Sequence, residues 1–175
     1  EKMFDDPTRP LVCDLGCGMG VSLLGLASLK QNNATRDGFD YNHDKDLDWF
    51  DCNFLGVDLS HLTINYAKSI ARRWSIHGKV TFVVATAESL LECVKSYPGG
   101  VQRILIQFPT PYRLPDSIGT TTCNGNTWRR AKGGNSQLPR TLEDGFMVNP
   151  TLLRHCSDVL RPTSGTLLLQ SNCED

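Results

Sequence analysis

The sequence predicts an α/β fold built on a doubly wound, mostly parallel sheet. Short apolar runs typical of buried strands alternate with stretches of helical length and periodicity. A glycine-rich turn joins the first apolar run to the first helix, and polar residues directly follow several of the other runs. The chain has 175 residues, of which 39% are hydrophobic, enough to bury one core. We therefore expect residues 1–175 to form a single domain.

The first apolar run, residues 11–15, leads into a turn with glycine at alternate positions, Gly16, Gly18 and Gly20. Glycine lets the backbone approach a ligand with no Cβ in the way. The helix expected at 21–30 directs its free N–H groups toward the same place. The spacing differs from the Gly-x-Gly-x-x-Gly of dinucleotide-binding folds, because the third glycine comes two residues after the second. The turn predicts a nucleotide site, with an ordinary strand-to-helix turn as the alternative.

A second strand is expected at 53–58. An acid at its end, here Asp58, is where a carboxylate binds ribose hydroxyls in nucleotide-binding βαβ units. Ser60 caps the helix that follows, and we expect this helix to end at His77-Gly78 with Gly78 as its C-terminal cap. The residues that helical spacing places on its buried face are Thr63, Ala67, Ile70, Ala71 and Trp74.

The rest of the chain continues the alternation. The remaining strands are expected at 80–85, 101–108 and 166–172, and the remaining helices at 89–96 and 146–160. A strand order of 3-2-1-4-5 would bring the loops after Leu15, Asp58, Ala85 and Phe108 to one edge of the sheet. Two prolines around Thr110 make the last of these loops stiff. We expect the four loops to enclose one ligand.

Two polar segments interrupt this alternation. Residues 31–51 are rich in aspartate but lack the glycine and glutamate spacing of a calcium loop, so we expect a solvated insert that faces away from any RNA. Residues 113–145 form a long loop in which basic residues outnumber acidic ones up to Arg140. The formal net charge is -1, so an RNA-binding surface must be a local patch rather than a global field.

The composition also limits the class of protein. The 7 cysteines are scattered and only Cys13 and Cys17 are close together, so we expect no metal site. Reduced thiols in an intracellular protein, cytoplasmic or nuclear, are the simplest interpretation. No apolar run approaches the length of a membrane span and no signal peptide is visible, so no membrane partner is expected. The chain begins without methionine and stops directly after a strand-like run, which suggests an excised or truncated domain.

Four segments together resemble the tRNA (guanine-N7)-methyltransferase family, whose members have a Rossmann-like class I methyltransferase fold. These segments are Asp14-Leu15-Gly16-Cys17-Gly18-Met19-Gly20, Phe54-Leu55-Gly56-Val57-Asp58, Thr86-Ala87-Glu88 and Phe108-Pro109-Thr110-Pro111-Tyr112-Arg113. The glycine segment is common to class I methyltransferases, and the double-proline segment is specific to the family. The resemblance covers most of the chain except the two polar segments. Since such a fold usually carries two more strands, we expect it to be truncated here after the fifth.

The resemblance implies S-adenosyl-L-methionine (SAM) as methyl donor, S-adenosyl-L-homocysteine (SAH) as product and guanine in tRNA as acceptor. The residues implied at the cofactor are Asp14, Gly16, Gly18, Gly20, Asp58, Leu59, Thr86, Ala87 and Gln107. Among them, the resemblance implies that Gly16 and Gly18 lie near the methionine part, Asp58 at the ribose, Thr86 and Ala87 along the adenine, and Gln107 near the sulfonium. Thr110 is the catalytic candidate at the acceptor, with Tyr112, Arg113 and Asn172 around the incoming nucleotide.

The long basic segment extends this candidate site toward tRNA or another structured RNA. Arg129, Arg130 and Lys132 are candidates for phosphate contacts, and Trp128 or Tyr112 for stacking on a base. The alternative is that Trp128 is a buried anchor of the loop and that the basic side chains are simply solvated.

Two departures from the family concern the acceptor. The family has aspartate where this chain has Thr110, and usually Thr-Asp where this chain has Ser171-Asn172. Guanine N7 carries an in-plane lone pair and no proton, so an acid there would orient the base and offset its growing charge rather than act as a base. A threonine hydroxyl can do only the first, so we expect a slower enzyme rather than an inactive one.

Three other functions remain as alternatives. The first is a SAM-dependent methyltransferase acting on a protein or nucleobase amine, although the proline spacing fits it less well. The second is a catalytically weakened SAM- and RNA-binding subunit that works with a partner chain. The third, a dinucleotide oxidoreductase, is disfavoured by the glycine spacing.

Overall fold

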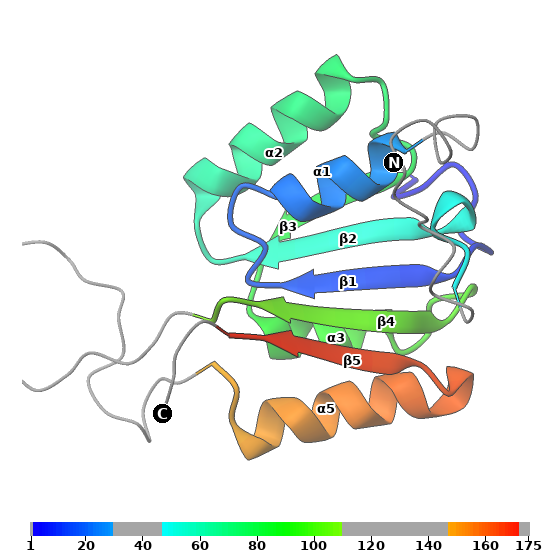
Figure 1. Cartoon of the computed structure of the whole chain (residues 1–175), viewed down its shortest axis with the longest axis vertical. Coiled ribbons are helices and arrows are strands. Elements are labelled where there is room, and N and C mark those ends of the chain that lie inside the picture. The colour runs from blue at the N-terminus through cyan, green and yellow to red at the C-terminus, as the bar shows by residue number, and fades with distance from the viewer. Residues whose placement is uncertain (1, 30–46, 110–146, 172–175) are drawn as a thin grey trace, which may run out of the picture.

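The structure is a computed structural model, and it describes residues 2–29, 47–109 and 147–171. Within these ranges the strands form one five-stranded sheet with helices on both faces (Figure 1). The strands are β1 (Leu11–Leu15), β2 (Asn53–Asp58), β3 (Val80–Val84), β4 (Val101–Gln107) and β5 (Thr166–Gln170). The helices are α1 (Val21–Ser28), α2 (His61–Arg73), α3 (Ala87–Val94) and α5 (Pro150–Leu160), with short 3-10 helices at Trp49–Asp51 and Arg161–Thr163.

The strand order is β3-β2-β1-β4-β5, and every pairing between neighbours is parallel. This confirms the predicted doubly wound sheet and its order. The chain moves outward from β1 through β2 to β3, and then returns to the other side of β1 to form β4 and β5. The described residues therefore have a Rossmann-like, doubly wound fold. In such sheets, ligands bind beyond the carboxyl ends of the strands where the winding reverses, here between β1 and β4.

The core has two layers because successive side chains along a strand point to opposite faces. In β1, Leu11, Cys13 and Leu15 pack with the buried side chains of α3 and α5. Val12 packs in the other layer, with the buried side chains of α1 and α2. Burial on both faces explains why β1 is an unbroken apolar run until Asp14.

The boundaries of α2 differ from the sequence-based expectation. The helix ends at Arg73 rather than at Gly78, and Ser75 just beyond it has a left-handed φ of 56°. Trp74 is 51% exposed and does not belong to the buried face, whereas Ile64 does. Trp74 N still donates to Ile70 O at 2.9 Å, so Trp74 is the last residue held by the helix, and no described element covers its side chain.

Two other helices begin where a side chain caps them. Asn149 Oδ1 accepts a hydrogen bond from Leu152 N at 2.8 Å, so α5 begins at Pro150 rather than at residue 146. The Thr86 hydroxyl accepts from Ser89 N at 3.2 Å, and α3 begins two residues earlier than expected. Both differences follow from cap residues that set the entry of the chain into each helix.

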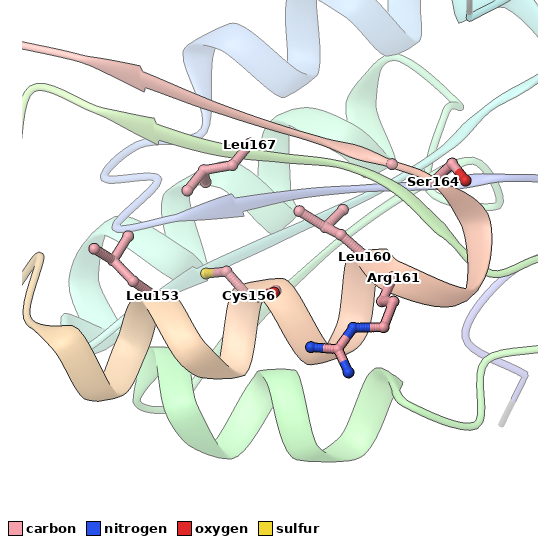
Figure 2. A pocket seen from close by; sticks show the side chains of 8 residues that line it. Leu153, Cys156, Leu160, Arg161, Ser164 and Leu167 are labelled. Atoms are coloured by element: carbon pink, nitrogen blue, oxygen red, sulfur yellow. The ribbon is translucent and has the colours of Figure 1, made fainter.

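A shallow hollow of about 440 Å³ lies between α5 and the edge strand β5, shown in Figure 2. Its apolar walls are Leu153, Cys156 and Leu160 of α5 and Leu167 of β5, with Arg161 at its rim. None of the site residues expected from the sequence lines it.

Several expectations concern residues that the structure does not describe. Residues 31–46 of the acidic insert and the whole of the long basic loop, 113–145, lie outside the described ranges. The prediction that residues 1–175 form a single domain therefore stays a prediction. Within the described ranges, no helix is long and apolar enough to cross a membrane, and no group of three His, Cys, Asp or Glu side chains is placed to hold a metal ion.

Candidate functional site

The glycine turn after β1 has a backbone that favours glycine at all three positions. The φ angles of Gly16, Gly18 and Gly20 are 78°, 53° and 69°. A Cβ added at Gly20 would lie 2.6 Å from Phe82 Cζ, so the turn also sits directly on the core. A Cβ at Gly18 would meet no described atom within 4 Å. The turn is thus closed against the protein at Gly20 and open at Gly18.

The turn is tied to the end of β2 by three backbone amides. Gly16 N and Cys17 N both donate to Val57 O, at 2.8 and 2.9 Å. Gly18 N donates to Asp58 Oδ2 at 2.9 Å. Asp58 Oδ1 accepts from Ser60 N at 2.8 Å, which fixes the carboxylate between the glycine turn and the start of α2. The expectation that Asp58 and the glycine turn share one edge of the sheet is confirmed.

Asp58 keeps acceptor capacity in this arrangement. Each carboxylate oxygen has two lone pairs, and each uses one for a backbone amide. The half-buried carboxylate can therefore still accept hydrogen bonds from a pair of ligand hydroxyls. That is the chemistry expected of a ribose-binding acid at the end of β2.

Asp14, near the end of β1, is the second carboxylate of the site. It is only 1% exposed, and its Oδ1 has no hydrogen-bond partner among the described residues. Burial, with a smaller contribution from the charge of Asp58, raises the pKa of Asp14 to about 7. A buried acceptor without a donor is costly, and a ligand with an ammonium or N–H group would satisfy it.

Cys17 lies in the same turn but is not a candidate nucleophile. Its sulfur packs where a Cβ of Gly56 would be, at 2.8 Å from that position. Burial, with smaller contributions from Asp14 and Asp58, raises the pKa of the Cys17 thiol far above its usual range. The thiol is therefore protonated and serves as packing beneath the turn.

The other expected cofactor residues lie at or just after the carboxyl ends of β2, β3 and β4. Leu59 is 62% exposed beside Asp58. Thr86 is exposed, and its hydroxyl caps α3 by accepting a hydrogen bond from Ser89 N. Ala87 is half-buried and packs against the core. Gln107 ends β4, half-buried and paired with β5. The strand ends thus bring these residues to one edge, but their contacts with a ligand remain predictions.

The exit of β4 has an unusual backbone. Phe108 has a left-handed φ of 51°, is 53% exposed and precedes Pro109. Its amide donates to Gln170 O at 2.8 Å, which ties the exits of β4 and β5 together. A left-handed aromatic residue before proline is strained, and such strain is concentrated at functional sites. The left-handed φ of Phe108 is a backbone conformation, so the residue types alone could not reveal it.

The expected acceptor and RNA residues lie outside the described ranges, and their roles stay predictions. They are Thr110, Tyr112, Arg113, Arg129, Arg130, Lys132 and Asn172.

Sequence reasoning missed one described residue of the site, Met147. A Cβ added at Gly16 would lie 3.3 Å from Met147 Sδ, so this thioether packs on the glycine turn. No local pattern marks Met147, because its contact is with a turn far away in the sequence.

The chain is similar to proteins named tRNA (guanine-N(7)-)-methyltransferase. The relatives from Synechococcus elongatus, Nostoc sp. and Trichormus variabilis are each 26% identical over 113 residues, which is 64% of this chain. The matched region covers 44%, 43% and 44% of these relatives, respectively, so the chain spans less than half of the curated proteins it matches. No protein-family model matches the chain.

Three solved structures that resemble this chain have lower sequence identity to it than the curated relatives. A crystal structure of the [4+2]-cyclase SpnF has a TM-score of 0.38 at 20% identity, covering 61% of this chain and 30% of that one. Geranyl diphosphate methyltransferase in complex with SAM has a TM-score of 0.37 at 19% identity, covering 61% and 33%. An rRNA methylase from Streptococcus thermophilus has a TM-score of 0.40 at 12% identity, covering 59% and 48%.

Proposed function

We propose that this chain is the SAM-binding part of a SAM-dependent methyltransferase whose acceptor is guanine N7 in tRNA. The observation that carries the proposal is the hydrogen bond from Gly18 N to Asp58 Oδ2 at 2.9 Å. It joins the glycine turn and the ribose-binding candidate in one site, beside the buried Asp14 Oδ1, which has no hydrogen-bond partner among the described residues. The 26% identity to curated tRNA (guanine-N(7)-)-methyltransferases supports the same function.

The residues of the site fit this cofactor. Asp58 has free lone pairs for the two ribose hydroxyls. Asp14 Oδ1, which no described residue satisfies, suits the ammonium group of the methionine part, since a nearby cation would stabilise the ionised carboxylate against its raised pKa. The open side of Gly18 leaves room for the ligand to approach the backbone. Bound SAM supplies an electrophilic methyl group on a sulfonium.

The acceptor assignment depends on segments outside the described residues. Phe108-Pro109-Thr110-Pro111-Tyr112-Arg113 supports it, because the strained exit of β4 leads straight into this segment. Thr110 and Asn172 would hydrogen-bond the guanine, with Tyr112 and Arg113 beside the nucleotide. Arg129, Arg130 and Lys132 would contact phosphates. Such an acceptor implies a protein that works where tRNA is found, in the cytoplasm or nucleus.

Catalysis in this proposal is chiefly alignment. Guanine N7 has an in-plane lone pair, so the protein needs to hold it in line with the methyl group and the leaving sulfur. Thr110 can orient the base through its hydroxyl but cannot offset the positive charge that grows on the ring. The proposal therefore includes slow turnover.

The experiment that tests the function uses this chain with methyl-labelled SAM and bulk tRNA, followed by digestion to nucleosides. We expect labelled 7-methylguanosine, a loss of label in Asp58→Ala and a faster rate in Thr110→Asp. A thermal-shift titration in parallel should show stabilisation by SAH and none by NAD. Stabilisation by NAD alone would contradict the cofactor assignment, and label in another nucleoside would contradict the acceptor.

A second candidate function is a SAM- and RNA-binding subunit that has lost catalytic power. The neutral residues Thr110 and Asn172, where the family carries acids, favour it. In that case SAH would still stabilise the chain, tRNA would bind without becoming labelled, and Thr110→Asp would not restore transfer.

A further inference from the structure

The side chain of Met147 packs on the glycine turn at the one position where a Cβ is missing and the backbone is exposed. A Cβ built at Gly16 would lie 3.3 Å from Met147 Sδ and 3.5 Å from its Cε. Gly16 itself is exposed and has a φ of 78°. The Met147 thioether therefore packs over Gly16, next to the space that a side chain at this position would fill.

Met147 is anchored on its other side by α5. Asn149 N donates to Met147 O at 3.1 Å, and the side chain of Asn149 caps the first turn of α5. Met147 also packs against the core layer shared by α3 and α5, and it is half-buried. The residue thus connects the start of α5 to the glycine turn across the exit of β1.

Other contacts of the glycine turn lie on its β2 and β3 sides. Gly20 is closed against Phe82, and Gly16 N and Gly18 N are tied to the end of β2. A Cβ at Gly18 would find no described atom nearby. On the side that faces α5, the atoms nearest to a Cβ at Gly16 are those of the Met147 thioether. Met147 can therefore set the position of the Gly16 peptide.

We propose that Met147 is a positioning residue of the cofactor site, which braces the Gly16 peptide and walls the space beside the amino-acid end of the ligand. This inference rests on the proposed function, because it takes the ligand to be SAM or SAH with its methionine part at the glycine turn. A thioether suits the role, since it is unbranched and polarisable and fills an irregular gap against backbone.

The test compares two ligands that share a nucleoside and a sulfur atom. SAH carries the amino-acid part, whereas 5′-methylthioadenosine lacks it. In Met147→Ala we expect the calorimetric Kd for SAH to rise about 10-fold, in line with the loss of a packed methionine side chain. The Kd for 5′-methylthioadenosine should change less than about 2-fold. Met147→Leu, similar in volume, should keep SAH binding within about 3-fold of the unmodified chain.

Met3→Ala is the matched control. Met3 is also a methionine and 52% exposed, and it precedes Asp5, whose amide donates to Gly78 O at the opposite edge of the sheet. Its SAH affinity should equal that of the unmodified chain. An equal weakening of both ligands in Met147→Ala would overturn the proposal, because it would indicate a general structural role. An unchanged Kd for SAH would also overturn it.

A ligand-free measurement separates this inference from the proposed function. In Met147→Ala we expect faster amide hydrogen exchange in residues 15–20, with no change in 80–84 at the core of the sheet. If the unmodified chain does not bind SAH, the proposed function fails and so does the ligand part of this inference. Faster exchange would still support the bracing role of Met147, and unchanged exchange would overturn it.

Discussion

Buried polar groups differ between the side of the sheet where the strands begin, the amino edge, and the side where they end, the carboxyl edge. Asn53, at the start of β2, and Asp14, near the end of β1, are each 1% exposed. Asn53 Nδ2 donates to Asp6 O at 2.6 Å and to Tyr97 Oη at 2.7 Å. Asp14 Oδ1, in contrast, has no described partner. Buried polar groups are normally satisfied, so the difference points to the carboxyl edge as the place completed by a ligand.

The glycines at the two edges show the same contrast. At the amino edge, a Cβ at Gly99 would lie 2.7 Å from Thr8 O, because the N-terminal segment packs directly on that turn. Gly99 N also donates to Pro7 O at 3.1 Å. At the carboxyl edge, a Cβ at Gly18 would meet no described atom within 4 Å. The amino edge is closed by the chain itself, and the carboxyl edge leaves backbone accessible.

The largest expected effect concerns the part of the carboxyl edge that is closed. Gly20→Ala would place a Cβ 2.6 Å from Phe82 Cζ at a φ of 69°, so we expect a loss of about 3 kcal/mol in the free energy of unfolding. Gly18→Ala has a similar positive φ but open space, and should cost only about 1 kcal/mol. Urea denaturation measures both, and equal losses would show that backbone strain, not Phe82, makes Gly20 necessary.

A variant of Asp58 tests whether the carboxyl edge is the binding edge. Asp58→Ala removes the candidate ribose acceptor and the partner of Gly18 N, so we expect SAH affinity to fall about 100-fold, since buried polar groups of the site are left unpaired. Asp51→Ala is the control at the amino edge, where Asp51 forms an exposed ion pair with Arg9 at 3.4 Å. If calorimetric titration gave equal SAH affinities for the two variants, the carboxyl edge would not be the binding edge.

A variant of Asn53 tests the opposite half of the comparison. Asn53→Ala leaves Asp6 O and Tyr97 Oη without a donor, so we expect a loss of about 2 kcal/mol in the free energy of unfolding. The Kd for SAH, measured well below the melting temperature, should not change. A large change in SAH affinity without a loss of stability would mean that the two edges are not separate in function.

The pH dependence of stability tests the unpaired carboxyl group. Unfolded Asp14 ionises near pH 4, whereas burial raises its pKa to about 7 in the folded chain. Between these values the folded state binds more protons, so Asp14 makes the free energy of unfolding fall as the pH rises. Its contribution is at most about 1.4 kcal/mol per pH unit.

Asp14→Asn should remove this contribution. Urea denaturation at pH 5 and pH 8 should show a smaller loss of stability at high pH in Asp14→Asn than in the unmodified chain. Gly25→Ala, in open space on α1, is the control and should keep the original pH dependence. The same slope in Asp14→Asn and the unmodified chain would mean that Asp14 is satisfied in solution.

Much of this edge was predictable from local patterns. The glycine spacing predicted the turn, and the polar end of 53–58 predicted a carboxylate at the same edge, whose binding to ribose stays a prediction. Parallel strands have their carboxyl ends at one edge, and the order 3-2-1-4-5 places β2 beside β1, which brought both together. The end of α2 was not predictable in the same way, because the left-handed Ser75 is a backbone state that no spacing of apolar residues reveals.

The sequence by itself determined the order of elements, the strand and helix periodicity, and the residue types at each strand end. These depend on local sterics and on which side chains avoid water. Only the tertiary structure decided that Asp58 would accept from Gly18 N, that Asp14 Oδ1 would be buried with no donor among the described residues, and that Met147 would pack on Gly16. Each of these joins segments far apart in the chain or depends on desolvation, and both are set by packing.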